Sequence, residues 1–312
     1  MTVILAIANR KGGVGKSTVS TMLAHSLAIW GRQRVLVIDL DSQANSSLIL
    51  MGGNGWAQAR IEERTAADYL FEQFSSDRGD SARYIFPQVG DVLDLDGFVP
   101  AIDLIPGSLE MENYERDLLH RLSGSHTDFN RVAETIKGRI TKRIEQAGMN
   151  YDAVIVDCPP GVSFAMEAAL AMADKVVVPF RPDYVSVFAV DRIARMIEDA
   201  PNPRALQEIP KASRRYVTLV NLYQQKPSHQ RLIEDIGAFH PVMKTRIPQS
   251  PAVANAFDWE RERRLIDKKY GAAVGMLREL FNELSPMVKS LGDKKGAMNA
   301  WREKTLYTRP TA

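Results

Sequence analysis

The sequence predicts a single-domain α/β fold in which a mostly parallel, twisted sheet is covered by helices on both faces. Short apolar runs, each suited to one buried strand, recur at 3–8, 34–38, 153–157, 175–179, 216–221 and 242–248. Segments with apolar residues at helical spacing separate them, including 16–30, 129–147, 164–172 and 187–198. Strands that alternate with helices favour a parallel sheet, because the connection between two parallel strands is usually a helix. Fully apolar strands also favour a sheet that is buried on both faces.

Composition indicates a soluble protein with a substantial core. The chain has 312 residues, of which 45% are apolar and 25% are charged, as is ordinary for globular domains. Its length alone allows one large domain or two small ones. No basic-then-apolar leader opens the sequence and no apolar run approaches the roughly 18 residues of a membrane span, so we expect a cytoplasmic protein. The single cysteine, Cys158, excludes an intrachain disulfide and a thiolate-bound metal cluster built from one chain.

The net charge of +2 hides an asymmetry along the chain. Residues 1–200 carry 20 Lys and Arg against 27 Asp and Glu, whereas residues 201–312 carry 20 against 11. A basic C-terminal third favours a polyanionic partner such as DNA, because clustered cations gain affinity by displacing counterions from phosphates. The alternative is a solvated surface with a basic tail, and the sequence charge alone does not distinguish the two.

The first strand leads into a glycine-rich stretch and then into a helix. The stretch reads Lys11-Gly12-Gly13-Val14-Gly15-Lys16-Ser17-Thr18. This context suits a phosphate-binding loop, because glycines let successive backbone N–H groups turn inward around a polyphosphate at the positive end of a helix. Lys16 is then expected to reach the β- and γ-phosphates, and the Ser17 hydroxyl to bind Mg²⁺. The usual loop opens with a glycine where this chain has Arg10, and Lys11 is an additional cation.

The second strand, 34–38, is followed by two aspartates, Asp39 and Asp41. The carboxyl ends of strands in α/β sheets are where ligands bind, so both carboxylates are expected beside the phosphate loop. Residues two apart in a strand face the same side, and both side chains can therefore point toward a nucleotide if the strand geometry continues that far.

Residues 52–150 are harder to interpret. The glycines at 52–55 predict a break in the chain, and 65–74 predicts a short helix that is followed by a polar loop at 75–80. Residues 102–106 predict a short strand, and 129–147 a helix with one solvated face. We find no internal repeat and no low-complexity tract.

A third aspartate, Asp157, ends the apolar strand at 153–157, and Cys158-Pro159-Pro160 follows as a turn. A strand that ends in aspartate is by itself more often just a turn. Together with the upstream loop, however, Asp157 is interpreted as a carboxylate that helps to hold Mg²⁺ through water.

Toward the C-terminus, 252–256 and 270–284 predict closing helices, whereas 289–312 lacks clear apolar periodicity. The expected organisation is one large domain over 1–285, with an insertion at about 52–130, and a C-terminal tail over 286–312.

In that order, the segments Lys11–Thr18, Asp39–Gln43 and Asp157–Pro160 resemble the deviant Walker A, Walker A′ and Walker B motifs of the ParA/MinD ATPases. Asn9 before the loop and Gln43 after the aspartates make the chain more similar to ParA/Soj partition ATPases than to MinD. The motifs cover few positions, but the alternating pattern extends the similarity to about residue 285.

The resemblance implies an ATP- and Mg²⁺-dependent ATPase that works as a switch. ATP-bound monomers would form a homodimer, the dimer would bind double-stranded DNA nonspecifically, and a ParB-like protein or cargo adaptor would stimulate slow hydrolysis. The cargo would be a plasmid, a chromosome or a large protein assembly, and the protein would be cytoplasmic and associated with the nucleoid.

The resemblance also implies roles for individual residues. Lys11 would cross to the phosphates of the second subunit, Asp41 would orient the attacking water, and Lys16 would bind the transferred phosphate. The other residues of the loop would bind phosphates: Gly12, Gly13, Val14, Gly15, Ser17 and Thr18. Mg²⁺ would be held by Ser17, Asp39 and Asp157. The adenine would be contacted by the Asn221 side chain and by the main chain near Pro248.

Departures from the family pattern affect two of these regions. Proline is common after Asp41, where this chain has Ser42, and arginine is common after the Ile-Pro pair, where this chain has Gln249. Candidate DNA contacts, any of which is alternatively a solvated surface charge, are Lys211, Arg214, Arg215, Arg261, Arg263, Arg264, Lys268 and Lys269.

Three other functions remain open from the sequence. A MinD-like ATPase would act at a membrane surface through a C-terminal amphipathic helix, but 277–284 suits the last core helix better, since no basic face accompanies a continuous apolar stripe. A reductase like the nitrogenase iron protein would need a pair of cluster cysteines, and the chain has only Cys158. Kinase or synthetase chemistry on a small substrate is the third alternative.

Overall fold

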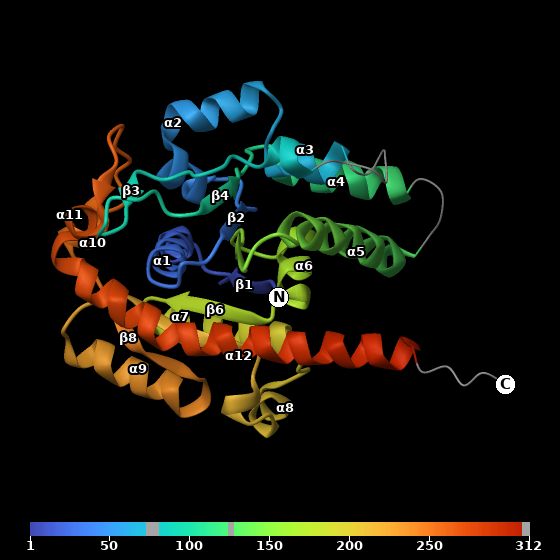
Figure 1. Ribbon diagram of the computed structural model, residues 1–312. Helices are drawn as coiled ribbons and strands as arrows, with labels where there is room; N and C mark the ends of the chain where they lie inside the picture. Colours follow the sequence, from blue (N-terminus) through green and yellow to red (C-terminus); the bar gives the residue numbers. More distant parts are fainter. Residues whose placement is uncertain (73–80, 124–127, 308–312) are drawn as a thin grey trace.

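The computed structural model describes the whole chain except residues 73–80, 124–127 and 308–312. Within the described residues, the main sheet has seven parallel strands in the order β4-β2-β5-β1-β6-β7-β8 (Figure 1). The strands are β1 (Val3–Ile7), β2 (Val35–Asp39), β4 (Ile102–Ile105), β5 (Ala153–Asp157), β6 (Lys175–Phe180), β7 (Tyr216–Tyr223) and β8 (Val242–Pro248). The predicted parallel α/β fold is confirmed.

Helices connect the strands and cover both faces of the sheet. They are α1 (Lys16–Ile29), α2 (Asn45–Ile61), α3 (Ala66–Glu72), α4 (Met111–Ser123), α5 (Phe129–Gly148), α6 (Phe164–Met172), α7 (Tyr184–Glu198), α8 (Pro203–Glu208), α9 (Pro227–Phe239), α10 (Pro251–Asn255), α11 (Ile266–Tyr270) and α12 (Val274–Tyr307). Single 3₁₀ turns lie at Ser81–Tyr84, Lys211–Ser213 and Gly271–Ala273.

The alternation of side chains along β1 shows how the core is divided into two layers. Leu5 and Ile7 pack with residues of α1 and α12, whereas Ile4 and Ala6 pack with residues of α5, α6 and α7. All four side chains are buried, as expected for a central strand that is covered on both faces. The carboxyl ends of β2, β5 and β1 therefore come together at one edge of a rigid sheet.

Helix α2 continues through a segment where the sequence predicts a break. The glycines at 52–55 lie inside α2, and only Gly52 departs from helical geometry, with φ 71° and ψ 165°. The kink has a packing reason, because a Cβ on Gly52 would lie 2.6–2.9 Å from ring atoms of Trp259. The predicted break is therefore a kink in the helix. The predicted polar loop at 75–80 lies outside the described residues.

Much of the expected insertion at 52–130 is integral to the fold. Strand β4, which the sequence predicts, pairs with β2 in the main sheet. A two-stranded parallel sheet, which the sequence does not predict, joins β3 (Val92–Leu93) to β9 (Arg264–Leu265). The middle of the chain is thereby attached to a segment close to its C-terminus.

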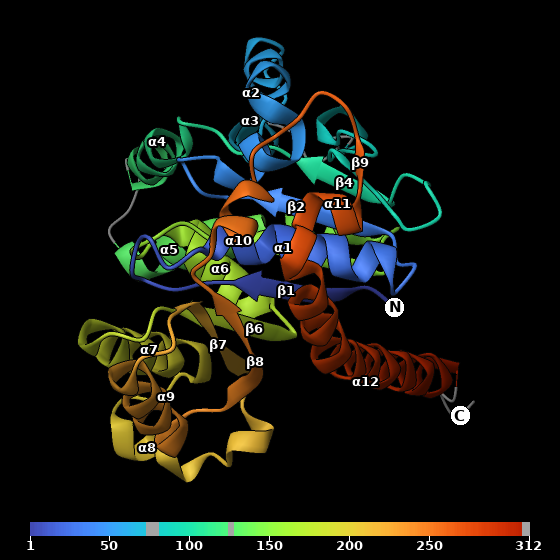
Figure 2. The ribbon, with the colours of Figure 1, turned by 90° about the vertical axis from the view of Figure 1, so that its left-hand side faces the viewer.

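The C-terminal segment differs from the expected tail. Helix α12 extends past Leu284 to Tyr307, and its C-terminal end leaves the body of the protein (Figure 2). The tail is expected because 289–312 lacks clear apolar periodicity, but Val288 is buried and continues the stripe of Leu277, Leu280 and Leu284. These three leucines have no exposed surface, so 277–284 is a core helix as predicted. Among the described residues, no helix is long and apolar enough to cross a bilayer.

Candidate functional site

Residues 8–15 form a tight loop between β1 and α1, and glycines determine its shape. Gly13 and Gly15 have φ values of 70° and 80°, in the left-handed region that glycine adopts without strain. Gly15 is also required by space, because a Cβ there would lie 2.1 Å from Asn221 Nδ2. The loop leads directly to the first N–H groups of α1, at Lys16 and Ser17, where a helix attracts anions.

Two buried asparagines anchor this loop to the sheet. Asn221 Nδ2, at the end of β7, donates to the Val14 carbonyl at 2.8 Å. Asn9 Nδ2 donates to the Pro179 carbonyl at 2.8 Å, and its Oδ1 accepts from the Lys11 amide at 3.0 Å. Asn221 therefore fixes the loop through the Val14 carbonyl, and the sequence does not indicate this contact.

Three aspartates lie beside the loop at the carboxyl edge of the sheet. Asp39 and Asp157 are paired in register at the ends of the neighbouring strands β2 and β5, and both are fully buried. Asp41 follows β2 and is 5% exposed, and its amide donates to Asp39 Oδ1 at 3.1 Å. The prediction that these carboxylates gather beside the glycine loop agrees with the geometry.

Burial disfavours the ionised forms of the two aspartates. Burial and the neighbouring charge of Asp157 raise the pKa of Asp39 to about 8. Burial raises the pKa of Asp157 to about 6, although the hydrogen bond from Ser46, the nearby Ser17 hydroxyl and the charge of Lys16 oppose it. Two buried carboxylates on neighbouring strands favour a bound cation, because its positive charge neutralises both.

The residues present fit a magnesium-bound polyphosphate. Asp157 Oδ1 is buried and has no hydrogen-bond partner among the described residues, so one acceptor remains available to a metal or its water. The loop amides, Lys16 and Ser17 supply donors for phosphate oxygens on the other side. Ser17, Asp39 and Asp157 are the residues that could hold the metal, as the sequence predicts.

Lys11 is engaged by a residue that the sequence does not indicate. Its Nζ lies 2.6 Å from Oδ2 of Asp183, in the loop between β6 and α7. Asp183 also caps α7, since its Oδ1 accepts from the Ser186 amide at 2.9 Å. Burial acts to raise the pKa of Asp183, but the hydrogen bonds from Lys11 and Ser186 outweigh it and lower the pKa. The ion pair therefore holds the Lys11 side chain at the N-terminus of α7.

An exposed apolar surface adjoins this ion pair on the first two turns of α7. Tyr184, Val185 and Phe188 are 79%, 62% and 67% exposed. Large apolar side chains that gather at one place on a surface often mark an interface. This apolar surface begins at the residue after Asp183, and Asp183 is paired with Lys11. The surface and Lys11 are therefore on the same side of the molecule.

Asn221 and Pro248, which the sequence predicts as adenine contacts, lie on the same edge as the loop. Pro248 ends β8 and pairs with Tyr223 of β7, two residues beyond Asn221. Contacts between these residues and a base remain a proposal, since Asn221 already uses its amide to bind Val14.

The predicted DNA contacts fall into two separate places (Figure 2). Arg214 and Arg215 precede β7, near α8, and the guanidinium groups of both donate hydrogen bonds to backbone carbonyls. Arg214 is 3% exposed and donates to the carbonyls of Leu206, Ile209 and Phe239. Arg215 donates to carbonyls at the C-terminal ends of α6 and α7. We therefore correct the prediction for Arg214: its guanidinium is buried in the protein and is not presented to DNA.

The second group lies around β9 and α11, and acidic residues are interleaved with it. Residues 258–268 carry four basic and four acidic side chains. Arg264 pairs with Glu260 at 2.5 Å, and Arg263 donates to the carbonyls of Gln88 and Gly90. Arg261 and Lys268 are exposed, and neither side chain has a hydrogen bond or ion pair within the described residues.

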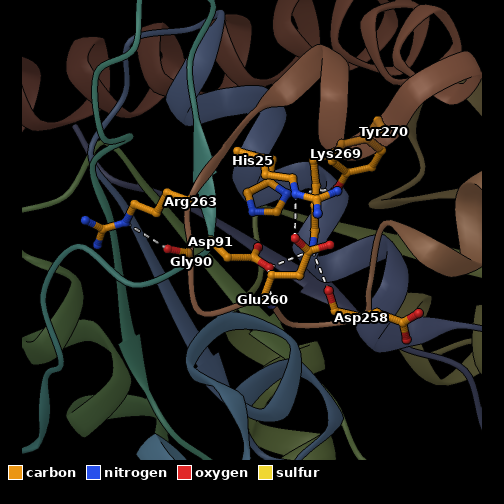
Figure 3. Close-up of polar contacts among 9 residues, drawn as sticks. His25, Gly90, Asp91, Asp258, Glu260, Arg263, Lys269 and Tyr270 are labelled. Atoms are coloured by element: carbon orange, nitrogen blue, oxygen red, sulfur yellow. Dashed lines mark hydrogen bonds and ion pairs between the residues drawn. The ribbon is translucent and has the colours of Figure 1, made fainter.

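Lys269, unlike Lys268, belongs to a buried polar cluster. Figure 3 shows Lys269 and Asp91 pointing toward one another, with Nζ and Oδ2 2.6 Å apart and both side chains under 5% exposed. Lys269 Nζ also donates to the Asp258 carbonyl, and Asp91 Oδ2 accepts from the Glu260 amide at 2.8 Å. This cluster, Asp91 with Lys269, Asp258 and Glu260, attaches the 258–264 loop to the segment before β3.

His25 and Tyr270 lie beside this cluster and are also buried (Figure 3). His25 Nδ1 and the Tyr270 hydroxyl are 2.8 Å apart, which links α1 to α11. Burial lowers the pKa of His25 to about 4, while Asp91 acts to raise it and Lys269 to lower it. The imidazole is therefore neutral at pH 7.

Replacing Lys269 with alanine is expected to destabilise the protein by about 3–5 kcal/mol, because it leaves the Asp91 carboxylate buried without its counter-charge. Urea denaturation of the purified chain measures the free energy of unfolding. The matched control is Lys268→Ala, whose exposed side chain should change that free energy by less than about 0.5 kcal/mol. Equal effects of the two substitutions would contradict a buried ion pair.

Comparison with known proteins places the chain in a family. The sequence profile of the AAA domain family matches residues 2–205. A Rhizobium rhizogenes protein described as a candidate replication protein A is 27% identical over 307 residues, covering 92% of this chain and 69% of that protein. The chromosome partitioning protein ParA of Caulobacter vibrioides is 29% identical over 284 residues, covering 88% of this chain and 91% of that protein. The sporulation initiation inhibitor protein Soj of Bacillus subtilis is 29% identical over 196 residues, covering 62% and 64%.

Solved structures share the fold. An ATP complex of a McdA variant from Cyanothece superposes with a TM-score of 0.64 at 16% identity, covering 93% of this chain and 96% of that one. Cobyrinic acid a,c-diamide synthase from Mycobacterium smegmatis, with an ATP analogue and magnesium bound, gives 0.63 at 24% identity, covering 93% and 97%. These two structures show the fold, and the family is identified by the sequence profile and the sequence relatives together with the loop and aspartates described above. The chain belongs to the AAA domain family, as a ParA/Soj-type ATPase of the deviant Walker A superfamily.

Proposed function

We propose that this chain is a Mg²⁺-dependent ATPase that dimerises when ATP is bound, binds double-stranded DNA nonspecifically and segregates or positions a cargo. A ParB-like protein or cargo adaptor stimulates its slow hydrolysis, and the protein works in the cytoplasm on the nucleoid. The observation that carries the proposal is the position of Lys11, a second lysine in the phosphate loop, beside an exposed apolar surface on α7.

Each residue of the site has a role in this proposal. The loop amides, Lys16 and Ser17 bind the phosphates, and Asp41 orients the attacking water. When bound, Mg²⁺ neutralises charge on the phosphate oxygens, and Ser17, Asp39 and Asp157 hold it. Lys11 leaves Asp183 and reaches the nucleotide of the second subunit, where its charge stabilises the transferring phosphoryl group. Hydrolysis is thereby coupled to dimerisation.

The relatives support the cargo-positioning part of the proposal. ParA of Caulobacter vibrioides is named for chromosome partitioning, and it matches most of this chain. The solved structures that share the fold include complexes with ATP and with an ATP analogue plus magnesium. ATP and Mg²⁺ are therefore the nucleotide and metal that we assign to the site described above.

DNA binding is assigned to the exposed cations around β9 and α11. Arg261 and Lys268 are the first choice, since Arg263 and Arg264 have partners within the chain. Charge reversal of both, Arg261→Glu with Lys268→Glu, is expected to weaken ATP-dependent binding to arbitrary duplex DNA. Its salt dependence, log Kd against log[salt], should lose about two units of slope, because each lost phosphate contact removes about one.

Filter binding of labelled duplex DNA with ATP, with ADP and without nucleotide measures this effect. The matched control is Arg204→Glu on α8, whose side chain is 91% exposed and lies away from β9. DNA affinity and salt slope that stay at wild-type values in the double variant would remove this surface from the proposal. Wild-type protein that binds no DNA in ATP at low salt would refute DNA binding altogether.

A further inference from the structure

Two consecutive serines hold the two buried aspartates of the site. Ser46 Oγ donates to Asp157 Oδ2 at 2.6 Å. Ser47 donates to Asp39 Oδ2 twice, from its Oγ at 2.6 Å and from its amide at 2.9 Å. Both serines belong to the first turn of α2 and neither has exposed surface.

The serines determine which carboxylate oxygens remain available. Asp39 has both oxygens occupied, since Oδ2 binds Ser47 and Oδ1 accepts from the Asp41 amide. Asp157 has only Oδ2 occupied, by Ser46, and Oδ1 has no partner within the described residues. The two carboxylates thus differ: each oxygen of Asp39 accepts at least one hydrogen bond, whereas Asp157 has one buried oxygen without a partner in the described part of the chain.

The surroundings leave little room for the Asp39 carboxylate to turn. Ser47 Oγ also accepts from the Gly107 amide at 2.8 Å, which ties α2 to the end of β4. A Cβ on Gly107 would lie 3.0 Å from Asp39 Cγ, so the backbone packs closely against this carboxylate. A serine that both donates and accepts fixes the orientation of its acceptor more firmly than packing alone.

We propose that Ser46 and Ser47 are positioning residues that aim the Asp157 and Asp39 carboxylates at the metal–nucleotide group. Ser46 holds Asp157 through Oδ2 and leaves Oδ1 available to that group, and Ser47 fixes the Asp39 carboxylate beside it, where it keeps acceptor capacity for a metal-bound water. This inference rests on the proposed binding of Mg²⁺ and ATP. Outer hydrogen-bond partners of this kind commonly contribute 10–100-fold to metal affinity.

Ser46→Ala is expected to raise the Mg²⁺ concentration at half-saturation of ATP binding by about 10-fold or more, whereas ATP affinity in EDTA stays within about 2-fold. Equilibrium binding of a fluorescent ATP analogue, titrated with Mg²⁺ at fixed nucleotide, measures both quantities. Ser46→Thr keeps the hydroxyl and should restore the wild-type Mg²⁺ midpoint. Ser47→Ala should shift the midpoint less, because its amide still donates to Asp39.

The matched control is Ser26→Ala, which removes another fully buried serine hydroxyl, one that donates only to the Leu23 carbonyl of α1. It should lower the melting temperature without moving the Mg²⁺ midpoint. If Ser46→Ala and Ser26→Ala behave alike, the serine has a structural role only and the inference is wrong. If Ser46→Ala does not fold, Ser46→Cys is measured in its place, with the same expected shift.

The two proposals fail in different ways. Wild-type protein whose ATP binding does not depend on Mg²⁺ would overturn the proposed metal site, and this inference with it. Wild-type protein with a clear Mg²⁺ midpoint that Ser46→Ala leaves in place would overturn only the positioning role.

Discussion

Replacing Lys11 with alanine should reduce dimer-dependent ATP hydrolysis by about 10³-fold or more while ATP binding by the monomer is kept. The physical reason is that a cation supplied to the transferring phosphoryl group from a second subunit has an effect of this size. It is not needed to hold the nucleotide, because Lys16 and the loop amides remain. The turnover rate per subunit should rise with protein concentration in the wild type and stay flat in Lys11→Ala.

The ion pair with Asp183 provides the reciprocal test. Asp183→Asn removes the charge that holds Lys11 within its own subunit, but an asparagine can still cap α7. The variant should therefore dimerise at lower ATP concentration than the wild type, as measured by light scattering during gel filtration. Wild-type hydrolysis in Lys11→Ala, with the same dependence on protein concentration, would refute the proposed role of Lys11.

Gly15→Ala should lower ATP affinity on the order of 100-fold, because the loop that binds the phosphates has to move. The new Cβ would lie 2.1 Å from Asn221 Nδ2, and the φ of 80° is itself unfavourable for alanine. A displacement of about 1 Å in a binding site commonly has an effect of this size. Isothermal titration with ATP and Mg²⁺ measures the affinity directly.

A matched control and a rescue sharpen this test. Gly53→Ala places a methyl group in α2 where no atom lies within 4 Å, so ATP affinity should be unchanged. Adding Asn221→Ala to Gly15→Ala removes the clash but keeps the strained φ, and it should recover only part of the affinity. Full affinity in Gly15→Ala alone would show that the loop and Asn221 are not packed as described.

The fold was predictable where the signal is local. Each central strand is a contiguous apolar run, and the glycine loop with its flanking strand and helix is contiguous too. Helix α12 was only partly predictable, because Pro286 falls where the core stripe gives way to a more polar segment. Helix α2 was missed since glycines, which usually break helices, here allow the close approach of Trp259.

The site residues that belong to a sequence motif were predictable. The residues that contact the motif from distant parts of the chain were not. Asp183 lies 172 residues from Lys11, and Ser46 lies 111 residues from Asp157. No local pattern indicates which serine or aspartate the fold will bring to such a partner. Arg214 illustrates the same limit in reverse, because its sequence neighbours suggest an exposed cation while the fold surrounds it with carbonyl oxygens.

The support of the glycine loop by Asn221 has a consequence for how the protein is made. During synthesis Val14 is made 207 residues before Asn221. Domains fold as units during synthesis, so the loop has its sequence long before it has its anchor. A nascent chain that ends before β7 lacks the amide that fixes the Val14 carbonyl. We therefore expect a chain without β7 to bind ATP more weakly than the finished protein, because the loop that is proposed to bind the phosphates lacks this hydrogen bond.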